Sequence, residues 1–305
     1  MRRHLNLRGC LGEASFKLFT FTALGLVVLI TLYPFWNTIV VSLNQASDTV
    51  RGGLSLWPRK WSMNNYKAVW VTANIPHAFF ISVSRTVLST LLNLATTSML
   101  AYALGRKEFV LRKPLTVIVI LSLYVNAGLF PNYFLIRNLG LVNSFLVYII
   151  PGMVGAFNFL VIRTYIRTIP ESIIESTRMD GAGEFLIYLR FVLPLCKPVL
   201  ATVALFVAVG AWNSWFDTVL YASQKPELFT LQYQLMALLQ TSMSQSKSAA
   251  DIGAAGMAAN MGQSMVTPVS IRAAITVIAA VPILLVYPFM QKYFITGLSL
   301  GSIKE

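Results

Sequence analysis

The sequence predicts an all-α integral membrane protein with six transmembrane helices. Of its 305 residues, 56% are apolar and 11% are charged, and the mean hydropathy is +0.67. Soluble domains usually carry about 25% charged residues, so a deficit along the whole length indicates a membrane protein. Helices are the expected way to cross because lipid offers no partners to backbone N–H and C=O groups.

Six stretches are apolar and long enough, at about 1.5 Å per residue, to cross a hydrocarbon core of about 30 Å. They are residues 18–43, 79–104, 114–136, 139–162, 198–216 and 273–290. The first follows a basic start but has no small-residue cleavage pattern, so we expect a retained helix rather than a signal peptide. Prolines in or near the spans predict kinks.

Charge predicts the orientation of these spans. Most of the 24 lysines and arginines fall on the side that holds both termini and the segments 105–113 and 163–197. The positive-inside rule then places both termini in the cytoplasm. The net charge of +13 therefore reflects topology rather than nucleic-acid binding, since the basic residues are dispersed between apolar runs.

Arg85 is the charged residue inside these spans. It lies about 10 Å inside the second span from its outer end, so it either reaches outward or faces a polar cavity. Asp217 is expected at the outer interface, which weakens it as a midplane proton carrier.

The chain lacks the sequence patterns of an ATPase or a hydrolase. There is no G-x-x-x-x-G-K-[ST], no H-E-x-x-H and no G-x-S-x-G. His4 and His77 have no Cys or His partners at ligand spacing, so we expect no metal and no catalytic site. Any uphill transport would take its energy from another chain.

Two long outer segments remain. Residues 44–78 carry tryptophans suited to a membrane interface. Residues 222–270 are poor in aromatic and β-branched residues, which predicts a mobile, solvated loop or a flexible element that reaches an external partner.

One cytoplasmic stretch concentrates the scarce acidic residues: ESTRMDGAGEFLIYLRFVLP, from Glu175 to Pro194. A short helix is expected at residues 170–181. Pro170 suits a first helical position, Glu171 complements the helix dipole, and Gly181 can end the helix in a left-handed conformation. Such a helix could rest on the membrane surface, but its acidic start suits a basic protein cleft better.

This stretch resembles the EAA–x3–G–x9–I–x–LP motif of permease subunits of bacterial ABC importers. Glu175-Ser176-Thr177, Gly181 and Phe191-Val192-Leu193-Pro194 match its spacing throughout. Ser176 and Thr177 stand where alanines are usual, and Phe191 replaces isoleucine; these are small or apolar exchanges.

The resemblance implies the transmembrane domain of a type I ABC importer, with a coupling helix that docks into a groove of the ATPase subunit. Glu175 would pair with a basic group there, and the next span, 193–216, would begin at Leu193 and Pro194. The coupling residues implied are Glu171, Glu175, Ser176, Thr177, Arg178, Asp180, Gly181, Leu193 and Pro194.

Stretches such as FVLPLCKPVLATVALFVAVGAWNSWFD and PFMQKYFITGLSLGSIKE extend the resemblance to carbohydrate importers. They are similar to the maltose-importer G-type subunit and to permeases for oligosaccharides, including alginate oligosaccharides. This implies a second homologous permease, two ATPases that bind ATP and magnesium, and a periplasmic or lipid-anchored solute-binding protein. No cofactor is implied in this chain itself.

Polar and aromatic residues in the outer half are candidates for a sugar path, because amides bond hydroxyls and rings cover sugar C–H groups. They are Asn126, Asn132, Asn158, Trp212, Asn213 and Trp215. The alternative is that they pack helices together and anchor them at the interface.

Two other functions stay open. One is an ABC permease for another solute, such as glycerol phosphate or amino acids. The other is a stand-alone secondary transporter or channel, although proton symport usually needs an acid or histidine inside a span.

Overall fold

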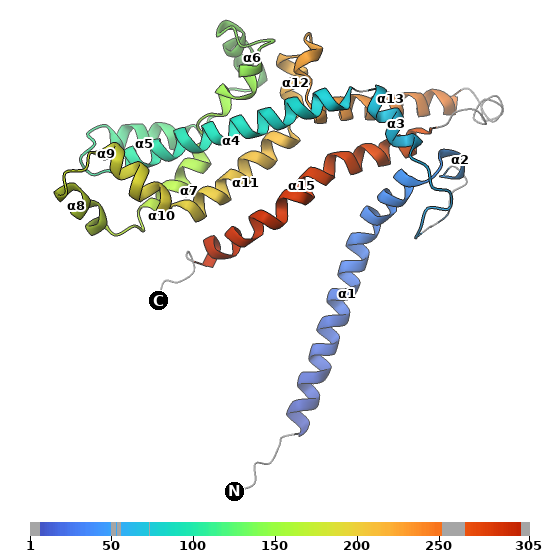
Figure 1. The fold of residues 1–305 in the computed structure, drawn as a ribbon, viewed down its shortest axis with the longest axis horizontal. Coiled ribbons are helices and arrows are strands. Elements are labelled where there is room, and N and C mark those ends of the chain that lie inside the picture. Colours follow the sequence, from blue (N-terminus) through green and yellow to red (C-terminus); the bar gives the residue numbers. More distant parts are fainter. Residues whose placement is uncertain (1–6, 50–52, 54–55, 73, 252–265, 300–305) are drawn as a thin grey trace. The chain divides into compact units, whose positions relative to one another are not determined.

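The computed structural model describes residues 7–49, 53, 56–72, 74–251 and 266–299, which are mostly helical (Figure 1). They form two compact units. One comprises Met1–Val71 and Leu239–Ile278, and the other comprises Thr72–Leu238 and Ala279–Glu305.

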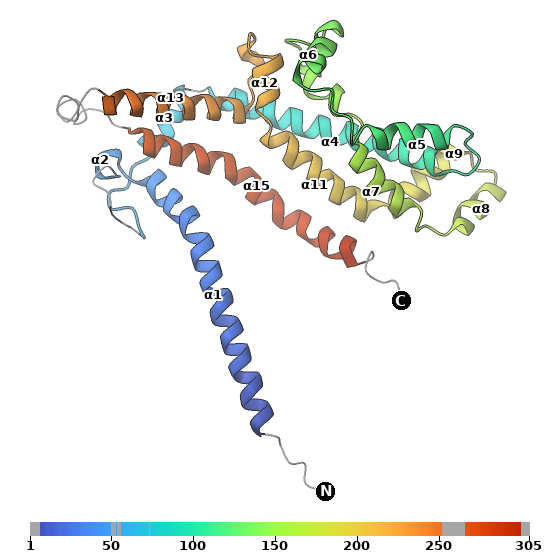
Figure 2. The same ribbon diagram turned by 180° about the vertical axis from the view of Figure 1, so that it is seen from behind.

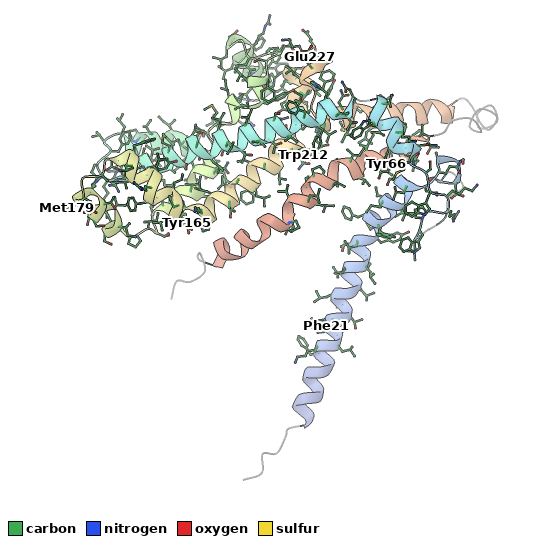
Figure 3. All side chains as sticks on the ribbon, viewed as in Figure 1. Phe21, Tyr66, Tyr165, Met179, Trp212 and Glu227 are labelled. Atoms are coloured by element: carbon green, nitrogen blue, oxygen red, sulfur yellow. The ribbon has the colours of Figure 1, made fainter. Side chains whose placement is uncertain are left out.

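In the first unit, α1 (Leu7–Leu43) leads to the short helices α2 (Ala46–Thr49) and α3 (Asn64–Thr72). Nδ2 of Asn65 donates 2.9 Å hydrogen bonds to the carbonyls of Ser42 and Asn44, which ties α3 to the end of α1. Upstream, α1 carries apolar side chains such as the labelled Phe21 in Figure 3, and no described residue of the first unit covers them. A helix apolar on all sides suits lipid or another membrane subunit.

The second unit is built on α4 (Ile75–Gly105), α7 (Ala156–Ile166) and α11 (Lys197–Asn213), which pack side by side (Figures 1 and 2). Phe159, Ile162 and Val203 are fully buried between them. This core forms the body against which the candidate site is built.

Two of the predicted spans are bent. The fourth begins with the 3-10 turns η1 (Phe145–Tyr148) and η2 (Ile150–Gly152), and the chain turns by 46° before α7. Pro151 lies in η2, just ahead of the break at residues 153–155, and has no N–H to donate to a helical ladder.

The fifth span follows the helix α8 (Glu171–Met179) and runs through α9 (Glu184–Ile187), the π-helical turn η3 (Tyr188–Val192) and α10 (Leu193–Leu195). It then bends by 80° into α11, next to Pro198. Proline and π-helical turns are the usual causes of such bends.

The predicted span 114–136 is not one helix. Helix α5 (Arg112–Leu121) ends early, and α6 (Leu129–Asn138) starts after an interruption. Gly128 precedes α6 with φ 84° and ψ 178°, a conformation that side chains other than glycine rarely allow. A hydropathy pattern does not register this backbone break, and the crossing of the membrane by residues 114–136 stays a prediction.

The segment predicted as a loop at 222–270 also differs. After α12 (Phe216–Tyr221) and η4 (Pro226–Leu228), residues Leu231–Asp251 form the helix α13. Its leucine, glutamine, alanine and methionine favour helix, whereas a low content of β-branched residues argues only against strands. Residues 252–265 of this segment lie outside the described part.

The last helix is α15 (Pro268–Ser299), with Pro282 and Pro288 inside it. Among the described residues, 3 helices are long and apolar enough to cross a membrane, or up to 5 if each bent pair is one span. The six-span count therefore stays a prediction.

Candidate functional site

The first candidate site centres on α8, the predicted coupling helix, which ends in a well-formed cap. Gly181 has φ 85°, its N–H donates to the carbonyl of Arg178 at 2.9 Å, and the N–H of Ala182 donates to that of Thr177 at 3.2 Å. This pair of bonds is the Schellman arrangement, in which a left-handed glycine satisfies the last carbonyls. The expected helix and its left-handed glycine are both present.

The two faces of α8 differ. Ile174 and Thr177 are buried, and Ile174 belongs to the core of the second unit. Glu175 is exposed, and Met179 (labelled in Figure 3) is 88% exposed at the end of the helix. No described residue forms an ion pair with Glu175, so its carboxylate is available to a partner.

Arg178 connects α8 to its own unit. Its Nη1 donates to Oε1 of Glu108 at 2.8 Å, and its Nε donates to Oε1 of Glu184 at 2.8 Å. The other carboxylate oxygen of Glu184 accepts from the hydroxyl of Tyr102 at 2.6 Å and lies 3.5 Å from Nε of Arg106. One guanidinium thus joins α8 to the end of α4 and the start of α9.

These contacts shift the ionisation of the surface groups. The hydrogen bond from Arg178 lowers the pKa of Glu108 to about 2. Next to it, Nζ of Lys107 lies 2.6 Å from Oε2 of Glu171, and this bond raises the pKa of Lys107. Glu108 and Lys107 therefore keep their charges at neutral pH.

The remaining predicted coupling residues have local roles. The hydroxyls of Ser176 and Thr177 both donate to the carbonyl of Ile173, and Asp180 is exposed at the cap. Leu193 packs against the core, whereas Pro194 is exposed; both precede the 80° bend. The side chain of Arg178, rather than that of Glu175, holds α8 to its own chain.

The second candidate site is an ion pair between the buried Arg85 of α4 and the partly exposed Asp217 of α12. Nη1 of Arg85 donates to Oδ1 of Asp217 at 3.3 Å and to the carbonyl of Ser214 at 3.1 Å, and Nη2 donates to Oδ2 of Asp217. The guanidinium carbon lies 4.6 Å from the ring centroid of Tyr148. Of the two alternatives for Arg85, the structure has the one that faces a cavity.

That cavity has a volume of about 670 Å³ and is more polar than another hollow of about 750 Å³ in the second unit. Its wall includes Arg85 and Asp217 together with Ser89, Asn132 and Tyr221. The ring of Tyr221 stacks on that of Tyr133 with centroids 6.1 Å apart.

Only Asn132 of the six predicted path residues lies in this wall. Asn126 accepts from the N–H of Gly128, and Asn213 donates to the carbonyl of Val209. Both amides therefore have local backbone contacts.

The other three make packing contacts. Nδ2 of Asn158 donates to Oδ1 of Asn93 at 3.2 Å. The ring of Trp212 meets that of Phe79 edge-on, and Trp215 lies against Phe216 in the same way. Their role in a path stays a prediction.

The sequence pattern predicted a location for Arg85 and for Asp217 separately, but not the contact between them. One signal was available: Arg85 was expected in the outer part of one span, and Asp217 at the outer end of another. A lone intramembrane charge needs a partner, and Asp217 was a candidate at that depth.

A bent bundle of apolar helices with an acidic helix docked beside it is the arrangement of a transport protein that works with other subunits. A family model described as "Binding-protein-dependent transport system inner membrane component" matches residues 97–300. The chain belongs to this family of ABC importer permeases.

The chain is 31% identical over 290 residues to the polygalacturonan/rhamnogalacturonan transport system permease protein YtcP of Bacillus subtilis (strain 168), covering 95% of this chain and 98% of that protein. It is 33% identical over 282 residues to protein LplC of the same organism, covering 92% of each.

Among solved structures, the chain resembles a bacterial ABC transporter involved in the import of the acidic polysaccharide alginate. The TM-score is 0.79 at 26% identity, with 93% of this chain and 98% of that chain covered. The predicted all-α membrane class and the importer family are thereby confirmed. The chain is a multi-pass permease of the inner membrane and not an enzyme; its family works with ATPase and solute-binding subunits.

Proposed function

We propose that this permease carries oligosaccharides, including those that contain uronic acids, across the inner membrane by alternating access. The observation that carries the proposal is similarity along nearly the whole chain to sugar permeases, with 95% of it matched to a polygalacturonan/rhamnogalacturonan permease. The alginate importer adds a structural neighbour whose cargo is also an acidic polysaccharide.

In this proposal the chain pairs with a second homologous permease and with two ATPases, which bind ATP and magnesium. A solute-binding protein delivers the sugar from the periplasm. The apolar surface of α1 suits contact with lipid or with a second membrane subunit. Both termini lie in the cytoplasm, as the distribution of lysine and arginine predicts.

Helix α8 is the part that the ATPase moves. Its outward face carries Glu175 and Met179, and its inward face is joined to the second unit by Ile174 and Arg178. A helix held on one side and free on the other can transmit a rigid-body displacement to the bundle.

The test is uptake by vesicles that contain this chain, the second permease, the ATPases and the solute-binding protein. We expect uptake of labelled uronic-acid trisaccharides that requires both ATP and the binding protein. Uptake that continues without the ATPase would contradict the proposal and favour a secondary transporter. If the vesicles take up a glycerol phosphate or an amino acid with ATP, but no sugar, the assignment as an ABC permease stands and the proposed sugar substrate is refuted.

A further inference from the structure

Arg85 has two unused hydrogen-bond donors in the described structure. A guanidinium carries five N–H groups. Both on Nη1 and one on Nη2 bond to Asp217 and to the Ser214 carbonyl, whereas Nε is buried without a partner. The Nε–H and the second Nη2–H lie parallel on one edge of the group, a fork that fits two neighbouring oxygen atoms.

The location of this fork indicates a ligand site. Arg85 is 4% exposed and lies in the wall of the 670 Å³ cavity described above. A buried ionisable residue within a membrane span is costly and usually functional. The Nε of Arg85 has no surface open to the cavity, so a ligand completes this hydrogen bond only after a small shift of the side chain.

The charge of the site favours hydroxyl groups over carboxylates. Arg85 and Asp217 together carry no net charge, so a second carboxylate would share one guanidinium with Asp217 and be repelled by it. Neighbouring sugar hydroxyls meet no such penalty, because they can accept from the Arg85 fork and donate to Asp217. The amide of Asn132 and the ring of Tyr221 in the same wall suit a sugar as well.

We propose that Arg85 and Asp217 form a sugar-binding contact of the transport path that reads hydroxyl groups and is indifferent to the charge of the sugar. This inference rests on the proposed function, since it places the cargo in this cavity. Arg85 and Asp217 would then determine specificity, although neither is among the six path residues predicted from the sequence.

The test compares uptake of a uronic-acid trisaccharide with uptake of its carboxyl-reduced, neutral counterpart in the vesicles described above. The measured quantity is the ratio of the two rates, relative to the same ratio for the unaltered chain. The binding protein is the same in every sample, so a change in this ratio reports on the permease.

Asp217→Asn leaves an uncompensated guanidinium, and we expect the ratio to rise about tenfold in favour of the acidic sugar. Arg85→Gln leaves an uncompensated carboxylate, and we expect a fall of about tenfold. These are the effects of one unit charge on another about 10 Å away at an effective dielectric constant of about 20. Thr86→Val is the control, because Thr86 lines a different, apolar hollow, and it should keep the ratio unchanged.

Both variants break the same ion pair, so a purely structural role predicts losses without opposite changes in the ratio. Shifts in the same direction, or none, would overturn the inference. If either variant fails to assemble, Asn132→Asp and Asn132→Lys on the exposed wall replace them, with a fall and a rise expected. An unchanged ratio in the Asn132 variants would also refute the inference. If the unaltered chain takes up neither sugar, the proposed function is refuted instead.

Discussion

Nη1 of Arg178 lies 2.8 Å from Oε1 of Glu108, and this contact joins α8 to the segment that follows α4. Glu184 completes the arrangement from α9. All the partners are charged and partly exposed, so solvent screens each pair and its contribution to stability is small. The contact therefore matters more for the position of α8 than for the free energy of unfolding.

Arg178→Gln should reduce ATP-driven uptake several-fold, because α8 would move without carrying α4 and α9 with it. The thermal midpoint of the purified importer should change little. Arg190→Gln serves as the matched control, since Arg190 is exposed and outside this network. Equal uptake by both variants would contradict a positioning role for Arg178.

Glu175→Lys should weaken binding of the ATPase, because it reverses the charge on the outward face of α8. The measurement is the amount of ATPase that co-purifies with the tagged permease. Glu227→Lys makes the same charge reversal at an exposed site in η4 (Glu227 is labelled in Figure 3) and should leave the yield unchanged. If Glu175→Lys retains the ATPase in full, Glu175 is not at the contact.

Gly181→Ala should cost about 1–2 kcal/mol, because alanine is strained at φ 85°. No atom lies within 4 Å of an added Cβ, so the cost comes from the backbone alone. Asparagine tolerates this region better. We expect thermal stability and uptake to decrease in the order Gly, Asn, Ala; equal values for Ala and Gly would show that the cap adapts.

Asn93→Ala should lower the thermal midpoint of the protein in detergent. Its Nδ2 donates to the carbonyl of Gly152 at 2.7 Å, and its Oδ1 accepts from Asn158, which joins α4 to the break before α7. Because the partners on Gly152 and Asn158 are not buried, each lost hydrogen bond costs about 0.5–1.5 kcal/mol. Asn158→Ala should show a smaller loss and an unchanged KM for sugar; a raised KM with normal stability would instead support the predicted path role.

Glu108→Gln should have the same effect on uptake at pH 6 and at pH 8. The pKa of Glu108 is lowered to about 2 by Arg178, so its contribution is present above the ordinary glutamate pKa and is lost only as the pH falls toward 2. The exposure of the pair keeps this contribution small. An effect that changes between pH 6 and pH 8 would indicate a different titrating group.

The sequence was informative where local rules decide the structure. Pro170, Glu171 and Gly181 predicted the bounds of α8, because caps and left-handed glycines act over a few residues. Long apolar runs likewise predicted α1 and α4. Hydropathy did not detect the interruption at Gly128, because the backbone angles of one residue leave the average hydropathy unchanged.

Long-range pairing could not be obtained in this way. Arg85 and Asp217 are far apart in sequence, and neither periodicity nor spacing brings them together. The roles of Asn158 and Trp212 could not be predicted either, because a polar residue in a span suits a transport path and a helix contact equally well. The structure shows the neighbours of each side chain, and the path role of both residues stays a prediction.

Helix α4 carries both candidate sites. Arg85 lies in its outer half, and Arg106 follows its last residue, about 30 Å away at 1.5 Å per residue. The helix has proline only at its start, so it is an unbroken rod between the α8 network and the polar cavity. A tilt of about 10° imposed at one end would shift the other by about 5 Å over that length, roughly the width of a sugar ring. A lever of this kind needs no relay of side chains to let an ATPase reshape a distant pocket.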